Sequence, residues 1–65
     1  MRILDCIEIN GKTLMVLDHD LPSTGWRELI VDGTKYATIP VMDMGDNSIA
    51  IDGIHDFIGK EVTFA

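Results

Sequence analysis

The sequence predicts an all-β fold: a small, six-stranded, partly open β-barrel built from hairpins. Apolar β-forming residues alternate or come in short runs, and turn residues interrupt them at a spacing of roughly eight to twelve positions, which is typical of small barrels and sandwiches. The dipeptides Asn10-Gly11 and Asp32-Gly33 favour two-residue hairpin turns, because both positions tolerate a positive φ. Closing the strands into a barrel removes exposed edges that so short a chain cannot otherwise cover.

The predicted elements follow one another along the whole chain. The strands are expected at 2–9, 13–17, 27–31, 35–42, around Ile49 and Ile51, and at 62–64. Residues 18–26 are predicted to form a loop, and Pro40 predicts an edge, a bulge or a bend because it lacks a backbone N–H. One tight turn or one helical turn is expected at 54–60, where Gly59 and the short length exclude a longer helix.

The alternation also predicts which side chains point into one interior. The expected core consists of Ile7, Leu14, Val16, Leu29, Val31, Ile39, Val41, Ile49, Ile51, Phe57, Val62 and Phe64. About a dozen side chains in one core leave little volume for a substrate cleft, so we expect no enzyme and no cofactor.

The length and composition indicate one domain spanning residues 1–65. A chain of this size buries only about 60% of the surface that its unfolded form exposes. Cys6 is the only cysteine, which excludes an internal disulfide and favours a reducing, cytoplasmic compartment. Only Ile3 and Leu4 follow Arg2 before Asp5 interrupts the apolar run, so we expect no signal peptide and no membrane-spanning segment.

The formal net charge of −6, from eleven acidic and five basic residues, argues against direct binding of nucleic acid. Phosphate backbones are bound by clustered lysine and arginine, and here the basic residues occur singly. Two interpretations of the acidity remain: it keeps the protein soluble, or it forms an acidic face that docks on a basic protein surface.

The segment 28–64 resembles the second, β-barrel domain of translation elongation factors and related reductase barrels. The matching features are L-I-V-D-G-T-K-Y, then I-P-V, then I-A-I-D-G, and a closing I-G-K-E-V-T-F, in which Gly59, Val62 and Phe64 would turn the chain into the last barrel strand. The glycine-rich early strand of that family is absent, and we expect no nucleotide-binding domain before the segment. The resemblance implies a barrel fold and no particular function.

Two clusters carry residues that bind metals in other proteins. Asp18-His19-Asp20 and His55-Asp56 would make a divalent-ion site if their loops met. Neither cluster has a known ligand spacing, so the preferred interpretation is turn chemistry, in which aspartates bond to local backbone N–H groups. We therefore predict no metal. Cys6 is expected to be a small core residue.

The candidate interface residues are Trp26, Arg27, Tyr36, Met42 and Met44. Trp26 either plugs one end of the barrel or anchors a protein interface, where tryptophan and arginine are enriched. The two methionines suit adaptable contact surfaces or ordinary packing.

These observations favour a non-enzymatic, protein-binding module of the cytoplasm, an accessory or inhibitor protein of the kind that phages and mobile elements encode. Two alternatives remain open: a structural subunit of a homo-oligomer, and a small metal-binding module that uses His19 and His55.

Overall fold

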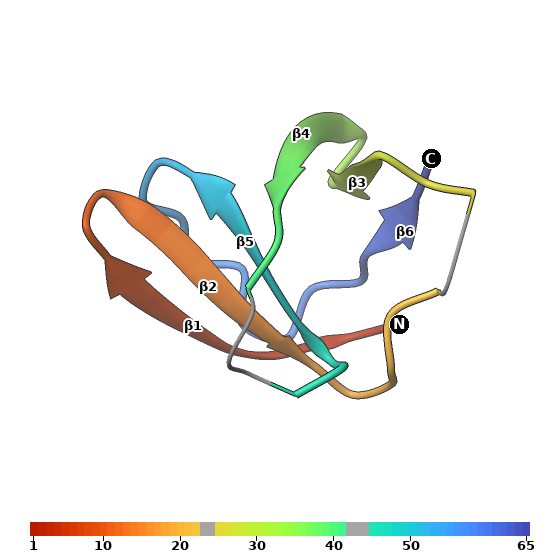
Figure 1. Ribbon diagram of the computed structural model, residues 1–65, viewed down its shortest axis with the longest axis horizontal. Coiled ribbons are helices and arrows are strands. Elements are labelled where there is room, and N and C mark those ends of the chain that lie inside the picture. Colours follow the sequence, from red (N-terminus) through yellow and green to blue (C-terminus); the bar gives the residue numbers. More distant parts are fainter. Residues whose placement is uncertain (23–24, 42–44) are drawn as a thin grey trace.

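The computed structural model describes residues 1–22, 25–41 and 45–65. Within these residues the chain forms no helix and six antiparallel strands of one sheet, in the order β1-β2-β5-β4-β3-β6 (Figure 1). The all-β, six-stranded prediction is confirmed. The strands are β1 (Ile3–Ile9), β2 (Lys12–Leu17), β3 (Glu28–Val31), β4 (Thr34–Ile39), β5 (Ser48–Asp52) and β6 (Thr63–Phe64).

Both predicted hairpin turns have the backbone conformation that their residues favour. In the β1–β2 turn, φ is 51° at Asn10 and 77° at Gly11. In the β3–β4 turn it is 53° at Asp32 and 78° at Gly33. Positive φ at both central residues matches the twist of the flanking strands, so these turns set the register of the two hairpins.

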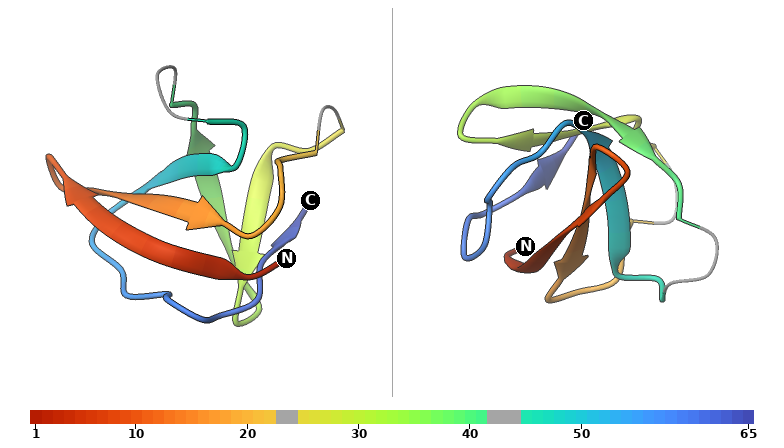
Figure 2. Two further views of the ribbon diagram at one scale, coloured as in Figure 1. Left: turned by 90° about the horizontal axis from the view of Figure 1, so that it is seen from below. Right: turned by 90° about the vertical axis from the view of Figure 1, so that its left-hand side faces the viewer.

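The sheet curls until its two ends almost meet, which makes a partly open barrel (Figure 2). Arg2 forms an isolated antiparallel bridge with Glu61. Three further backbone bonds join the same segments: Ile3 donates its N–H to the Lys60 carbonyl at 2.9 Å, Gly59 donates to the Ile3 carbonyl at 2.8 Å, and Val62 donates to the Met1 carbonyl at 2.8 Å. This contact stops after the first residues of β1, so the rest of that strand remains an edge.

A bulge in β1 determines which side chains of that strand reach the core. Ile3 pairs with Leu17 and Asp5 pairs with Val16, so one extra residue lies between the two pairs. Ile3 is therefore fully buried, whereas Ile7 is 41% exposed on the opposite face. The prediction of Ile7 as a core residue is wrong, because simple alternation cannot anticipate an inserted residue.

The core occupies the inside of the curled sheet. Its cluster consists of Ile3, Met15, Leu17, Leu29, Val31, Ile49, Ile51 and Val62. Phe57 and Phe64, both predicted as core residues, are half-buried and pack against this cluster. The sequence analysis missed Ile3, Met15 and Leu17, which lie in phase with the core only once the bulge and the hairpin register are known.

The prediction for the faces of β4 is also wrong. Ile39 pairs with Ala50, and Ala50 pairs in turn with Leu14, so all three lie on the outer face of the sheet. Ile39, Val41 and Val16 are only half-buried. Tyr36, which was not among the expected core residues, packs against the core cluster. Leu14 is buried as predicted, at 3% exposure, but outside that cluster.

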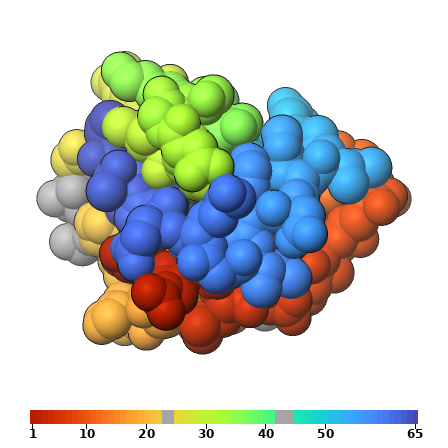
Figure 3. Space-filling model, turned by 180° about the vertical axis from the view of Figure 1, so that it is seen from behind, coloured from red at the N-terminus to blue at the C-terminus, as the bar shows by residue number. Residues whose placement is uncertain are grey.

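Of the two alternatives expected at 54–60, a tight turn and a helical turn, the structure shows the tight turn, and the other hydrogen bonds of this segment go mainly to other strands. His55 donates its N–H to the Thr13 hydroxyl at 2.9 Å, and Gly59, at φ 82°, bonds to β1. A single turn closes where Lys60 donates to the Phe57 carbonyl at 3.0 Å. Figure 3 shows this blue segment covering the space between the red N-terminal strand and the green β4.

A side chain of β1 satisfies a backbone N–H at the free edge of this strand. Cys6 donates its backbone N–H to the Asp5 carboxylate at 2.9 Å. Because Ile9 and Lys12 close the hairpin as a hydrogen-bonded pair, strand alternation directs the N–H and C=O of Cys6 away from β2. The Asp5 side chain therefore satisfies a backbone donor at the outer edge of the sheet.

Candidate protein-binding surface

A cleft of about 610 Å³ lies beside Trp26. It lies where the chain leaves β4 at Pro40 and diverges from the start of β5, and the loop after β2 forms its other wall. Its lining residues are Asp20, Leu21, Pro22, Trp26, Thr38, Pro40, Val41, Gly45, Asp46, Ser48 and Ile49. We refer to it as the Trp26 cleft.

Trp26 is held in place from two sides. Its ring packs edge-on against Phe64 with the centroids 4.8 Å apart, and its indole N–H donates to the Pro22 carbonyl at 2.6 Å. Half-buried and packed against the core cluster, the ring still lines the cleft. One side of the Trp26 side chain therefore packs against the core cluster, as a barrel plug would, and the other side lines the surface cleft.

Two carboxylates, Asp20 and Asp46, line the cleft with the apolar side chains. The backbone keeps them near each other, because Leu21 donates its N–H to the Asp46 carbonyl at 2.7 Å. No lysine or arginine is among the described lining residues, and the ion pairs found in the described parts of the chain involve neither aspartate. The cleft thus combines an aromatic wall with two negative charges that have no cationic neighbour there.

A second depression, the outer groove, adjoins the Trp26 cleft. It has a volume of about 320 Å³, and Pro40 and Val41 are the residues that both depressions share. Leu14 and Ala50 form its buried floor, and its described lining residues are Ile9, Lys12, Leu14, Ile39, Pro40, Val41 and Ala50. Lys12 is its one described charged group, and its amine lies 4.0 Å from the Asp52 carboxylate.

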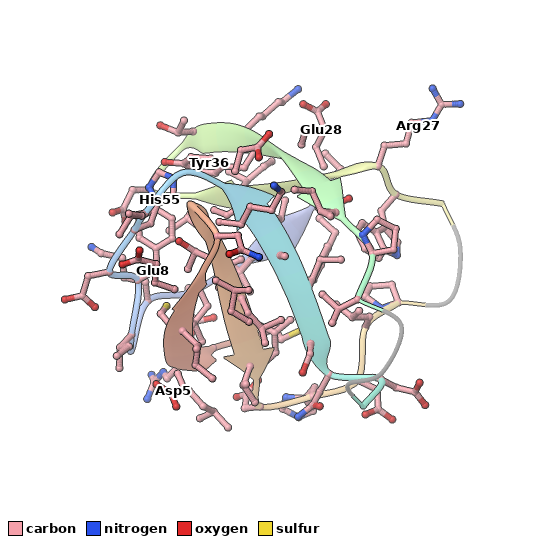
Figure 4. The ribbon with its side chains drawn as sticks, turned by 60° about the vertical axis from the view of Figure 1, so that its left-hand side comes forward. Asp5, Glu8, Arg27, Glu28, Tyr36 and His55 are labelled. Carbon is pink, nitrogen blue, oxygen red and sulfur yellow. The ribbon has the colours of Figure 1, made fainter. Side chains whose placement is uncertain are left out.

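Tyr36 belongs to a different part of the surface. Its ring lies 5.2 Å from that of His55 and 5.6 Å from that of Phe57, and the last two are stacked at 4.9 Å. Figure 4 shows Tyr36 and His55 side by side, with Arg27 projecting into solvent far from them. The structure therefore does not bring Tyr36 together with Trp26.

The remaining interface candidates contribute less to the cleft. Arg27 is exposed and lines another depression, of about 550 Å³, with Gly25, Trp26, Glu28 and Ala65. Met42 and Met44 lie outside the described residues. Trp26 lines the cleft, and its role in a protein interface stays a prediction. The sequence analysis missed Leu21, Pro22 and Asp46, whose contribution to the cleft depends on two loops meeting.

The two histidines lie at opposite ends of β2. His55 bonds to Thr13, near the beginning of that strand, whereas His19 follows its end and its Nδ1 lies 2.8 Å from the Asp18 carboxylate. Asp20 lies in the Trp26 cleft instead. Among the described residues, no three histidine, cysteine, aspartate or glutamate side chains are grouped as metal ligands would be.

Asp18 has a structural role at the end of the first hairpin. Its carboxylate accepts the Arg2 N–H at 2.9 Å, and its own N–H donates to the Arg2 carbonyl at 3.0 Å. The hydrogen bond with His19, followed by the one from Arg2, lowers the pKa of Asp18 below its ordinary value of 3.8. The Asp18 carboxylate thus bonds to a backbone N–H, as predicted for aspartates in turns, but the donor lies on β1 and is not local to the turn.

Cys6 is half-buried and packs against the core cluster, as expected for a small core residue. Burial raises the pKa of its thiol above 9.0, and the charges of Asp56 and Asp5 act in the same direction, against a hydrogen bond with the Phe57 backbone. A raised pKa suppresses the thiolate, which is the reactive form.

In the described parts of the chain, no helix has the length and apolar character needed to cross a membrane. The resemblance of residues 28–64 to elongation-factor barrels stays a prediction beyond the all-β fold itself. No protein-family model, no curated protein and no solved structure matches this chain.

Proposed function

We propose that this protein is a non-enzymatic binding module that holds a protein partner in the Trp26 cleft. The observation that carries the proposal is the composition of that cleft: an anchored tryptophan and aliphatic side chains beside Asp20 and Asp46. Tryptophan is enriched at the energetic centres of protein interfaces. Carboxylates at the edge of an apolar contact select a partner of opposite charge.

The same features suit recognition better than catalysis. The described titratable groups of the cleft are two exposed carboxylates. General acid–base chemistry requires a positioned pair in a site that excludes water. The Cys6 thiol, with its raised pKa, lines neither the cleft nor the outer groove. The proposed role is that of an accessory or inhibitor protein in a reducing compartment, acting on a partner with a basic surface.

The test is affinity capture from the native host with charge-reversed variants. Asp20→Lys combined with Asp46→Lys should abolish capture of the partner, because two attractive charges become repulsive. The matched control is Asp56→Lys, which reverses an exposed carboxylate outside the cleft. We prefer these changes to Trp26→Ala, since Trp26 also packs against Phe64 and its loss would disturb the fold. Equal capture by all these proteins would refute the assignment of the surface.

Self-association is a second candidate function, favoured by one specific observation. The outer face of β1 exposes Ile9 at 48% and Ile7 at 41%, both next to the free edge of the sheet. A second copy would cover this face, against the repulsion of two chains of charge −6. Light scattering across a range of protein concentrations and salt concentrations decides it: a constant monomer mass excludes this candidate.

A further inference from the structure

The Trp26 cleft and the outer groove form one surface with a shared wall. Pro40 and Val41 line both depressions, which therefore meet at this single segment. One ligand can reach both if it crosses that wall.

The wall also restricts the conformation of a ligand. An added β-strand needs backbone N–H and C=O groups on the edge that it joins. Pro40 has no N–H, and neither has Pro22 on the opposite wall of the cleft. A polyproline II segment needs no such donors, and it docks on grooves lined by aromatic side chains. It has three residues per turn and rises about 3.1 Å per residue, so side chains three positions apart lie about 9 Å apart on one face.

The two depressions differ in chemistry. The Trp26 cleft has two carboxylates, an aromatic face and no described cation, which complements a guanidinium or ammonium group. The outer groove has an apolar floor of Leu14 and Ala50 and one lysine at its rim, which complements an aliphatic side chain. A ligand that fills both depressions therefore needs two groups, a cation for the Trp26 cleft and an aliphatic side chain for the outer groove.

We propose that the partner is a proline-rich segment in the polyproline II conformation that places a cationic side chain in the Trp26 cleft and, three positions away, an aliphatic side chain in the outer groove. This inference rests on the proposed binding function and adds the chemistry and spacing of the bound segment. It predicts that neither depression alone gives full affinity.

Trp26 supplies the readout, because it is the only tryptophan of the chain. The probes are short synthetic proline-rich peptides that carry one arginine and one leucine three positions apart, titrated while the Trp26 fluorescence is recorded. We expect a saturable change. Replacing the arginine by citrulline, which keeps its shape and removes its charge, should weaken binding about tenfold, the scale of a charge-assisted contact. Moving the leucine to two positions from the arginine should weaken it by a similar factor.

Three protein variants and one control connect each peptide group to its depression. Asp20→Asn with Asp46→Asn should erase the preference for arginine over citrulline, whereas the control Asp56→Asn should preserve it. Ile9→Ser, at the exposed rim of the outer groove, should erase the preference for leucine over alanine and leave the arginine preference intact. Ala50→Leu should do the same by filling the floor, provided that its circular dichroism spectrum is unchanged.

The proposal fails if the peptide with both groups gives no saturable change at millimolar concentration, or if citrulline and the altered spacing bind equally well. Such a result leaves the proposed function standing when host capture still depends on Asp20 and Asp46. Loss of that dependence in the capture experiment refutes the proposed function itself. The two failures are therefore distinguishable.

Discussion

The two faces of the same sheet differ in what their apolar side chains do. On the inner face, Met15, Ile49 and Ile51 are buried against strands from both ends of the barrel. On the outer face, Leu14 and Ala50 are also buried, but they form the floor of a groove whose rim carries the exposed Ile9. Packing in the barrel core explains why the inner-face residues are apolar. The second set is apolar without being needed to close the barrel, which is why we assign it to a partner.

The largest expected effect tests the inner face. Ile51→Ala should lower the free energy of unfolding by about 2–4 kcal/mol, since it leaves a cavity among fully buried neighbours. Urea unfolding followed by circular dichroism measures this change. In so small a domain the variant should be largely unfolded at room temperature. A loss below 0.5 kcal/mol, well under the usual cost of such a cavity, would mean that the inner face is not the core.

A polar side chain on the inner face provides the next test. The Thr13 hydroxyl donates to the Gly53 carbonyl at 2.7 Å and accepts the His55 N–H at 2.9 Å. Thr13→Val should cost about 1–3 kcal/mol of unfolding free energy, because both backbone partners lose their bond. The matched control is Thr13→Ser, which keeps the hydroxyl. If valine and serine give the same urea midpoint, the hydroxyl does not anchor the 53–55 segment.

The outer face should respond differently. Ile9→Thr keeps the β-branched shape favoured in strands and should change the unfolding free energy by no more than about 0.5 kcal/mol, as is usual for exposed positions. The same variant should bind less 8-anilinonaphthalene-1-sulfonate, a dye that reports accessible apolar surface. A destabilisation as large as that of Ile51→Ala would make the two faces equivalent and remove the reason for assigning the outer one to a partner.

The smallest effect concerns Asp18, which directly follows β2 at the end of the first hairpin. Because the pKa of Asp18 is lowered in the folded state, its contribution to stability is present at neutral pH and is lost as the pH falls through that pKa, below 3.8. Asp18→Asn should therefore lower the urea midpoint at pH 7, and the gap to the unmodified protein should narrow toward pH 3. With Asp56→Asn as the control, a gap that is independent of pH would contradict the role of the carboxylate.

The parts of the fold that local chemistry determines were predictable from the sequence. Asn10-Gly11 and Asp32-Gly33 specify their turns almost alone, and the six strands follow from the spacing between turns. The faces were not predictable where the chain departs from strict alternation. The β1 bulge exposes Ile7. The faces of β4 do alternate, but which of them meets the core depends on pairing with strands distant in sequence, which puts Thr38 opposite the inner Ile51 and Ile39 opposite the outer Ala50.

The candidate site was predictable only in part, for a related reason. Trp26 could be identified because a large aromatic residue in a polar loop needs either a packing partner or a ligand, and here Phe64 provides the former. The cleft beside it depends on the contact between Leu21 and Asp46, two loop residues with no pattern that links them in the sequence. The separation of His19 from His55 by the length of β2 likewise required the topology.

The hydrogen bond of the Asp5 carboxylate affects how readily copies of this chain associate at high concentration. A newly made barrel with an uncovered edge can recruit a neighbour's strand and grow into fibrils. Such recruitment would have to displace the Asp5 oxygen from the Cys6 N–H and bring like charges together on adjacent chains. One short acidic side chain thus provides a barrier to fibrillar growth at the place where the barrel is left open.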